Sequence, residues 1–192
     1  MKAILLSIFV FSFSLLGAEP KVVGFDKLQK RGKAGSQLTY IPNQDTPFTG
    51  KAVSFYSNGQ KKQENNYKDG KLHGLRSWWY ENGQKRLEKN YKDDKLDGLW
   101  TSWYENWEKK QEKNYKDNER DGLWTNWYEN GQKAGEESYK DGKLMSAVRW
   151  KSNGEKCPET NVKDGNGVQI VYYKNGQKWK KTNYKDGKPH GL

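Results

Sequence analysis

The sequence predicts an all-β protein: an elongated, twisted single-layer antiparallel sheet of stacked β-hairpins. A unit of 24 residues recurs, and its first residue is Gly50, Gly74, Gly98 or Gly122 in successive copies. Turn dipeptides divide each unit twice, and the segments between them are rich in Trp and Tyr. A fixed period of this length indicates an array in which each unit packs on the next. Turns at such regular intervals leave no room for helices.

Residues 1–18 have the layout of a secretory signal peptide, in which a basic start precedes an apolar run and small residues. The apolar run covers about 14 residues, fewer than the roughly 20 that a spanning helix needs. We therefore expect an exported chain that begins near Glu19, in the periplasm, in the cell envelope or secreted. An N-terminal anchor that stays uncleaved is the alternative. No transmembrane span is expected after cleavage.

The formal net charge is +11, which favours partners with anionic surfaces. Because the chain is expected to be exported, nucleic acid is an unexpected partner. The candidate partners are then an acidic protein face, anionic lipid headgroups or acidic glycans. Cys157 is the one cysteine, so an intramolecular disulfide is impossible, and we expect its thiol to be inert.

After the signal peptide the chain divides into two parts. Residues 19–49 form a leader with a degenerate half-repeat, in which residues 38–41 resemble a strand. Residues 50–192 form the repeat array of about six units, the last of them truncated. The distance from Gly122 to Gly167 is 45 residues rather than two full units, so three residues are missing there.

Both kinds of turn dipeptide favour β-hairpins. Asn-Gly suits a type I′ turn, in which both central residues need positive φ. Asp-Gly recurs in the other half of the unit, where Asp117-Asn118 replaces it once. The strands between these turns should each pair with their neighbours in the sequence.

Strand alternation places the aromatic residues in columns that stabilise the sheet by roughly 0.2–1 kcal/mol per stacked pair. The first column is Phe55, Trp79, Trp103, Trp127, Trp150 and Tyr172; the opposite face carries Tyr56, Tyr80, Tyr104, Tyr128 and Tyr173; the second strands supply Tyr67, Tyr91, Tyr115, Tyr139 and Tyr184. The last strand expected, residues 178–185, is an exposed edge whose lysines discourage edge-to-edge pairing.

The unit G-x-W-x-x-W-Y-x-N-G-Q-K-x-x-E-x-x-Y-K-D-G-K resembles the bacterial variant of the MORN repeat over residues 45–192. More narrowly it resembles the YwqK family, whose members are often labelled antitoxin components. The resemblance implies stacked hairpins that act by binding and carry no catalysis. It also implies roles in membrane association or protein scaffolding, or the neutralisation of a toxin by direct contact.

No residue pattern indicates catalysis, a cofactor or a metal site. His73 and His190 are isolated turn residues far apart in the sequence. Glu64, Glu88, Glu112 and Glu136 recur one unit apart beside lysines, which is typical of ion pairs across a solvated face. We therefore expect a protein that is not an enzyme.

The candidate binding face combines aromatic residues with lysines. Strand alternation places Trp78, Trp100 and Trp124 on the face that also carries Tyr80, Tyr104 and Tyr128. Rings beside cations suit a protein contact, stacking on sugars or insertion at a membrane interface; the alternative is that these rings only cover the sheet. Trp107 replaces the glycine of an Asn-Gly turn, and is either a chance substitution or a contact residue.

These observations predict a non-catalytic scaffold that binds a protein partner through the aromatic, basic face. An anionic lipid- or glycan-binding surface and an antitoxin-type protein are the alternatives.

Overall fold

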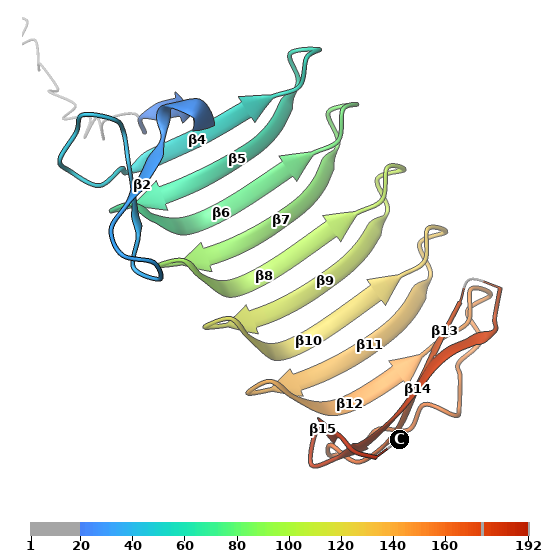
Figure 1. Ribbon diagram of the computed structural model, residues 1–192. Coiled ribbons are helices and arrows are strands. Elements are labelled where there is room, and N and C mark those ends of the chain that lie inside the picture. Colours follow the sequence, from blue (N-terminus) through green and yellow to red (C-terminus); the bar gives the residue numbers. More distant parts are fainter. Residues whose placement is uncertain (1–19, 174, 192) are drawn as a thin grey trace, which may run out of the picture.

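The computed structural model describes residues 20–173 and 175–191, so the signal peptide predicted for residues 1–18 lies outside the described part. A 10-stranded sheet runs through most of the molecule as a single twisted layer (Figure 1). Its antiparallel strands follow one another in sequence order, joined by short hairpin turns. The predicted fold class is confirmed.

The main sheet begins with a short parallel strand, β1, which pairs with β4. All later pairs are antiparallel, and each repeat unit supplies two strands. The strands are β1 (Val22–Gly24), β4 (Gly50–Phe55), β5 (Lys61–Lys68), β6 (Lys71–Trp79), β7 (Lys85–Lys92), β8 (Lys95–Trp103), β9 (Lys109–Lys116), β10 (Glu119–Trp127), β11 (Lys133–Lys140) and β12 (Lys143–Arg149).

The two turn families differ in conformation. At the Asp-Gly turns both residues have positive φ, as in Asp69 (49°) and Gly70 (78°), which is the type I′ geometry. At the Asn-Gly turns only the glycine does, as in Gly59 (83°). The type I′ prediction is therefore wrong for Asn-Gly. The asparagine instead accepts a hydrogen bond from the backbone N–H two residues later (Asn58 Oδ1 to Gln60, 3.0 Å), and the glycine takes the left-handed position that follows a tight turn.

The first glycine of each unit opens a bulge within the sheet. Gly98 has a φ of 102° and lies opposite Tyr115, beside a register shift. The side chain of Asn90 donates a hydrogen bond to the carbonyl of Leu99 at 2.9 Å, which satisfies a backbone group next to the bulge. Asn114 does the same for Leu123 in the next unit at 2.7 Å. These glycines therefore position the tyrosine columns.

The N-terminal segment folds against the first strands. It contains the 3-10 helix η1 (Phe25–Lys27) and a hairpin of β2 (Gln29–Arg31) and β3 (Leu38–Tyr40). The strand expected at residues 38–41 therefore exists, but it pairs with β2 and not with the array. A hydrogen bond of 2.8 Å from the Thr39 N–H to the Gly70 carbonyl ties the hairpin to the first turn of the sheet.

The main ladder ends at β12, so the expected pairing of each strand with its neighbours in the sequence stops there. β13 (Gly167–Tyr172), β14 (Lys178–Lys185) and β15 (Lys188–Pro189) form a separate 3-stranded sheet, the C-terminal cap (Figure 1). Tyr172 therefore leaves its predicted column, and β14 is the central strand of the cap rather than an exposed edge. The irregular chain between β12 and β13, the region shortened by three residues, supplies backbone partners to the edge of β12 instead of another strand.

The apolar core is small and lies where the cap meets the sheet. Trp124, Tyr139, Leu144, Ala147 and Val162 form one buried cluster. Most of the remaining array has no buried apolar cluster among the described residues. Contacts between side chains on neighbouring strands must therefore hold this part of the sheet together.

Candidate functional site

The sheet has two faces with different chemistry. We call the face that carries Trp100 the inner face, because both ends of the chain pack against it, and the opposite face the outer face. Strand pairing joins one inner-face residue from each strand between β4 and β12 into a continuous row, the inner row. Its members are Ala52, Asn65, Arg76, Lys89, Trp100, Lys113, Trp124, Glu137 and Ala147.

On the outer face, cations and carboxylates are matched. Each unit places a lysine three residues before a glutamate on the same strand, and the two side chains form an ion pair. The pairs are Lys61–Glu64 (2.7 Å), Lys85–Glu88 (2.5 Å), Lys109–Glu112 (2.6 Å) and Lys133–Glu136 (2.6 Å). The glutamate column therefore makes ion pairs, and these lysines are neutralised locally.

Four cations of the inner face lack carboxylate partners. Among residues 20–173 and 175–191, Arg76, Lys89, Lys113 and Arg120 make no ion pair with an acidic side chain. Their nearest aromatic neighbours are tryptophans: Lys113 Nζ lies 4.6 Å from the Trp100 ring centre and 4.9 Å from that of Trp124. Lys89 Nζ lies 5.9 Å from the Trp100 ring centre. These four cations therefore add positive charge to the inner face that no carboxylate there neutralises through an ion pair.

The lysines also change the expected aromatic columns. Rings one unit apart are separated by an intervening strand, and that strand places a lysine between them. In the first predicted column, Lys61 and Lys109 lie over the rings of Trp79 and Trp127, at 5.0 and 5.7 Å. On the candidate binding face, outside the predicted columns, Lys113 likewise bridges Trp100 and Trp124 through cation–π contacts. Direct contact between rings occurs beside the cap, where Trp124 meets Tyr115 at 5.1 Å and Tyr139 at 4.9 Å.

The pKa values of Lys89 and Lys113 show that the charged forms of these two lysines are disfavoured where they lie. Burial lowers the pKa of Lys89 from its ordinary value, and the Arg76 guanidinium lowers it further. Burial likewise lowers the pKa of Lys113, with Arg120 and Lys89 adding to the effect and Glu137 opposing it. An anionic ligand would relieve this repulsion.

A second row of unpaired cations, the margin row, borders the inner face near the Asn-Gly turns. Each of these cations is the next residue in the sequence after a lysine of an outer-face ion pair. Its side chain lies over a tyrosine ring. The pairs are Lys62 with Tyr56 (5.5 Å), Arg86 with Tyr80 (5.8 Å) and Lys110 with Tyr104 (5.3 Å). Each of these three dibasic pairs is therefore split between a neutralised and an unpaired cation.

The tyrosines under the margin row link successive units. The hydroxyl of Tyr80 donates to the carbonyl of Trp103 at 2.9 Å, and that of Tyr104 to the carbonyl of Trp127 at 2.9 Å. Tyr128 makes the corresponding bond to Trp150 at 2.8 Å. The hydroxyl groups of these predicted site residues are thus used within the array, while their rings support the margin cations.

Among the described residues, the N-terminal segment and the cap cover the ends of the inner face and leave its middle open. At one end a cavity of about 370 Å³ lies between the N-terminal segment and the sheet, lined by residues such as Thr39, Asn65 and Arg76. At the other a cavity of about 270 Å³ lies between the cap and the sheet, lined by residues such as Gln111, Tyr128 and Trp179. The stretch between them is centred on β7, β8 and β9.

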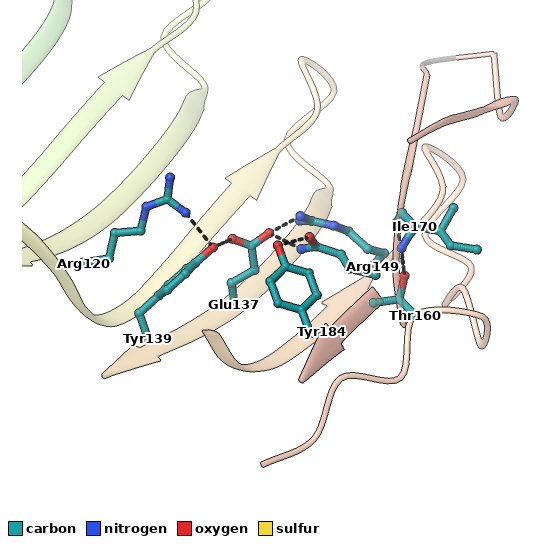
Figure 2. Close-up of polar contacts among 8 residues, drawn as sticks. Arg120, Glu137, Tyr139, Arg149, Thr160, Ile170 and Tyr184 are labelled. Atoms are coloured by element: carbon teal, nitrogen blue, oxygen red, sulfur yellow. Dashed lines mark hydrogen bonds and ion pairs between the residues drawn. The ribbon is translucent and has the colours of Figure 1, made fainter. Parts of the chain in front are cut away.

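A buried polar network fixes the cap to the sheet (Figure 2). Glu137 forms an ion pair with Arg149 and accepts a hydrogen bond from Gln169 of the cap at 2.6 Å. Tyr139 donates to Glu137 at 2.7 Å and accepts from Arg120 at 3.2 Å. The inner row thus places a glutamate under the cap where the two preceding units have Lys89 and Lys113, so the basic stretch ends there.

The remaining predicted site residues have distinct environments. Trp78 and Trp100 are half-buried on the open inner face, whereas Trp124 is only 6 % exposed and packs beneath the cap. Trp107 is 71 % exposed at the tip of the turn between β8 and β9, and the structure does not bring it into the inner row. The unpaired lysines of the inner row were not singled out in the sequence analysis. Their signal in the sequence is a lysine directly after the glutamate of a Lys-x-x-Glu pattern, as Lys89 follows Glu88 and Lys113 follows Glu112.

The described residues offer no candidate metal centre. They contain no group of three or more His, Cys, Asp or Glu side chains placed to hold a metal ion. Burial raises the pKa of the Cys157 thiol, which fits an inert side chain. Within the described part of the chain, no helix has the length and apolar character to cross a membrane.

The fold and this surface define a repeat-built β-sheet whose candidate site is a face rather than a pocket. The family model for the MORN repeat variant matches four segments: residues 48–69, 72–93, 120–141 and 166–186. The chain therefore contains MORN-type repeats, which in general form binding modules without enzymatic activity. A comparison with curated protein sequences found no match.

Proposed function

We propose that the chain is an exported, non-catalytic scaffold that binds the acidic surface of a partner protein through the open inner face. The observation that carries this proposal is the contrast between the two faces: outer lysines such as Lys85 are paired with glutamates, and inner cations such as Lys89 are not. Unpaired cations at a protein surface attract an acidic partner and fix its orientation.

The structure favours a protein over a membrane or a glycan. Because the N-terminal segment and the cap cover both ends of the inner face, a flat bilayer meets them before it meets Lys89 and Lys113. Sugars stack on open faces of aromatic rings. The Trp100 ring lies between Lys89 and Lys113 on the neighbouring strands, so its faces are already occupied. Neutralisation of a toxin by direct contact is a special case of the same proposal, because it needs the same surface.

The binding test compares two charge-matched variants. Lys89→Gln/Lys113→Gln removes two unpaired inner cations, and Lys85→Gln/Lys109→Gln removes two paired outer cations from the same strands. With poly-L-glutamate as the probe, calorimetry at low salt should show binding to the wild type and the outer variant, and at least about tenfold weaker binding to the inner variant. Added salt should weaken the binding.

Two results would contradict this account. Equal loss of affinity in both variants would show that only the net charge matters. Sedimentation of the wild type with vesicles of anionic phospholipid, reduced in the inner variant, would assign the face to a membrane.

Export is tested separately by cell fractionation. The proposal predicts a processed chain that begins near Glu19 outside the cytoplasm. A full-length product that stays in the cytoplasm would contradict the export proposal and leave the binding face untouched.

A further inference from the structure

We propose that the cavity between the cap and the sheet is a binding site for an uncharged sugar ring. The cavity has a volume of about 270 Å³, and its lining residues come from β9–β12 on the sheet side and from β13 and β14 on the cap side. Pockets for drug-sized ligands hold about 300–1,000 Å³, so this cavity suits a single ring. The site is separate from the open middle of the inner face, and the inference goes beyond the function proposed above.

Two residues that line this cavity are departures from the repeat. In three successive units the margin row places a cation over a tyrosine ring, namely Lys62, Arg86 or Lys110. The next unit has Ala134 at that position, and the unit that forms the cap has Trp179 there. Both of these residues line the cavity. The repeat therefore loses its margin cations where the cavity forms, which favours an uncharged ligand over an anion.

A third departure makes room for an arginine that lines the cavity. Gly135 lies where the preceding unit has Gln111, and its partner on β12 is Arg149. A Cβ at position 135 would overlap the guanidinium group of Arg149. Glu137 neutralises that group through an ion pair, but the buried Nε of Arg149 has no hydrogen-bond partner among the described residues. Buried polar atoms nearly always have a partner, so this N–H is a donor for a ligand.

Two amide side chains line the same cavity. Gln111 and Asn126 are direct neighbours on β9 and β10, and neither side chain makes a hydrogen bond within the part of the chain that the structure describes. An amide side chain both donates and accepts hydrogen bonds, as a sugar hydroxyl does, whereas an ionised carboxylate only accepts. Two amides beside the N–H of Arg149 therefore suit the hydroxyl groups of a sugar.

Aromatic rings form the apolar part of the cavity wall. Tyr128, Tyr172 and Trp179 line it, and no cation of residues 20–173 and 175–191 lies over their rings. They differ in this from Trp100, whose ring lies between two lysines. Trp179 is 60 % exposed, so a ligand can reach its ring. Such rings pack against the C–H groups of a sugar while the amides bind its hydroxyl groups.

The test measures the binding of uncharged sugars to the purified chain by NMR. The probes are D-glucose, D-galactose, D-mannose and N-acetyl-D-glucosamine. A ligand of about 12–15 non-hydrogen atoms should bind with a Kd of about 1–10 mM for the sugar that fits best. The indole N–H signal of Trp179 should shift as this sugar is added. No shift with any of the four at about 50 mM would overturn the inference.

Two comparisons test the class of ligand. Cyclohexanol has a six-membered ring with a single hydroxyl group, and it should bind at least about tenfold more weakly than the best sugar. Added salt should leave sugar binding unchanged, because Glu137 already neutralises Arg149. Equal binding of cyclohexanol would show that the cavity accepts any ring of this size. A salt-dependent affinity would show that charge attracts the ligand, and either result would contradict the inference.

Variants of the chain assign the site. Ala134→Lys restores the cation of the preceding units in the cavity wall, and Trp179→Ala removes the exposed ring. Each should weaken sugar binding at least about tenfold. Arg86→Ala removes a margin cation far from the cavity, and Trp107→Ala removes another exposed tryptophan, so both controls should bind as the wild type does.

Matching thermal unfolding curves would show that these variants are folded. The exposed position of Trp179 keeps the test valid if Ala134→Lys fails to fold. Unchanged affinity in folded Trp179→Ala would overturn the inference. Lys89→Gln/Lys113→Gln should keep sugar binding and lose binding to poly-L-glutamate, so the failure of one proposal is distinguishable from the failure of the other.

Discussion

At the scale of single residues, Trp107 shows how a repeat tolerates a local departure. It has a φ of 70° at a turn position where the other Asn-Gly turns place glycine. A left-handed conformation costs a residue with a side chain about 1–2 kcal/mol. The exposed ring recovers little of this cost through burial, because 71 % of the residue is accessible.

Trp107→Gly should therefore raise the free energy of unfolding by about 0.5–1 kcal/mol, since relief of the strain exceeds the added freedom of the unfolded chain. Urea unfolding measures this change. Trp107→Ala is the matched control, because it removes the ring and keeps the strain. If alanine stabilised the chain as much as glycine, the explanation through φ would be wrong.

Lys113 is a second residue whose position costs stability. Its pKa is lowered in the fold, so the unfolded chain binds the proton more tightly. The cost is fully present below the lowered pKa, and stability should recover as the pH rises from there towards the ordinary lysine pKa.

Lys113→Met should accordingly stabilise the chain by about 0.5 kcal/mol at pH 7, and the gain should shrink at alkaline pH. Lys109→Met, on the same strand, removes an ion pair with Glu112 and should leave stability unchanged or slightly lower. A destabilising Lys113→Met would show that its contacts with Trp100 and Trp124 outweigh the repulsion.

At the scale of strands and turns, much of the structure follows from the sequence. The 24-residue period and the Asn-Gly and Asp-Gly positions predict the order and length of the strands, because local turn chemistry decides both. The conformation of the Asn-Gly turns does not follow, since it depends on how each asparagine side chain bonds to the backbone. The unpaired state of Lys89 does not follow either, because it depends on which side chains lie across the strand pair.

The glycine bulge gives a test at this scale. Gly98→Ala would hold alanine at a φ of 102° and bring its Cβ to 3.4 Å from the Cβ of Asn90. We expect a loss of about 2 kcal/mol, measured by urea unfolding. Leu99→Ala, at the next position on the exposed outer face, should cost much less; equal costs would contradict a special role for the glycine.

The contact between the cap and the sheet is the other test at this scale. Glu137→Gln leaves Arg149 buried without a carboxylate and should cost about 3 kcal/mol. The double variant Glu137→Leu/Arg149→Met removes both charges and should cost less than the single one. Hydrogen exchange should rise in the cap of Glu137→Gln and stay unchanged in β5–β8, and a uniform rise would contradict a local contact.

At the scale of the whole molecule, shape and charge have different origins. Each unit contacts its neighbours, so the array extends by repetition, and the departures from the repeat define its limits. The shortened region between Gly122 and Gly167 turns the last unit into a cap, and Glu137 replaces the lysine of the preceding units beneath it. The sequence alone did not predict that both ends would cover the same face, because that depends on contacts between distant segments.

The central claim is that the partner meets the inner face between the covered ends. It is tested most directly with a photoreactive amino acid at position 102 or at position 101, which lie side by side on β8 and point to opposite faces. In cells that make the full-length protein, irradiation should crosslink one acidic partner from position 102, and Lys89→Gln/Lys113→Gln should abolish that crosslink. Crosslinking of the same partner from position 101, or its persistence without the two lysines, would contradict the account.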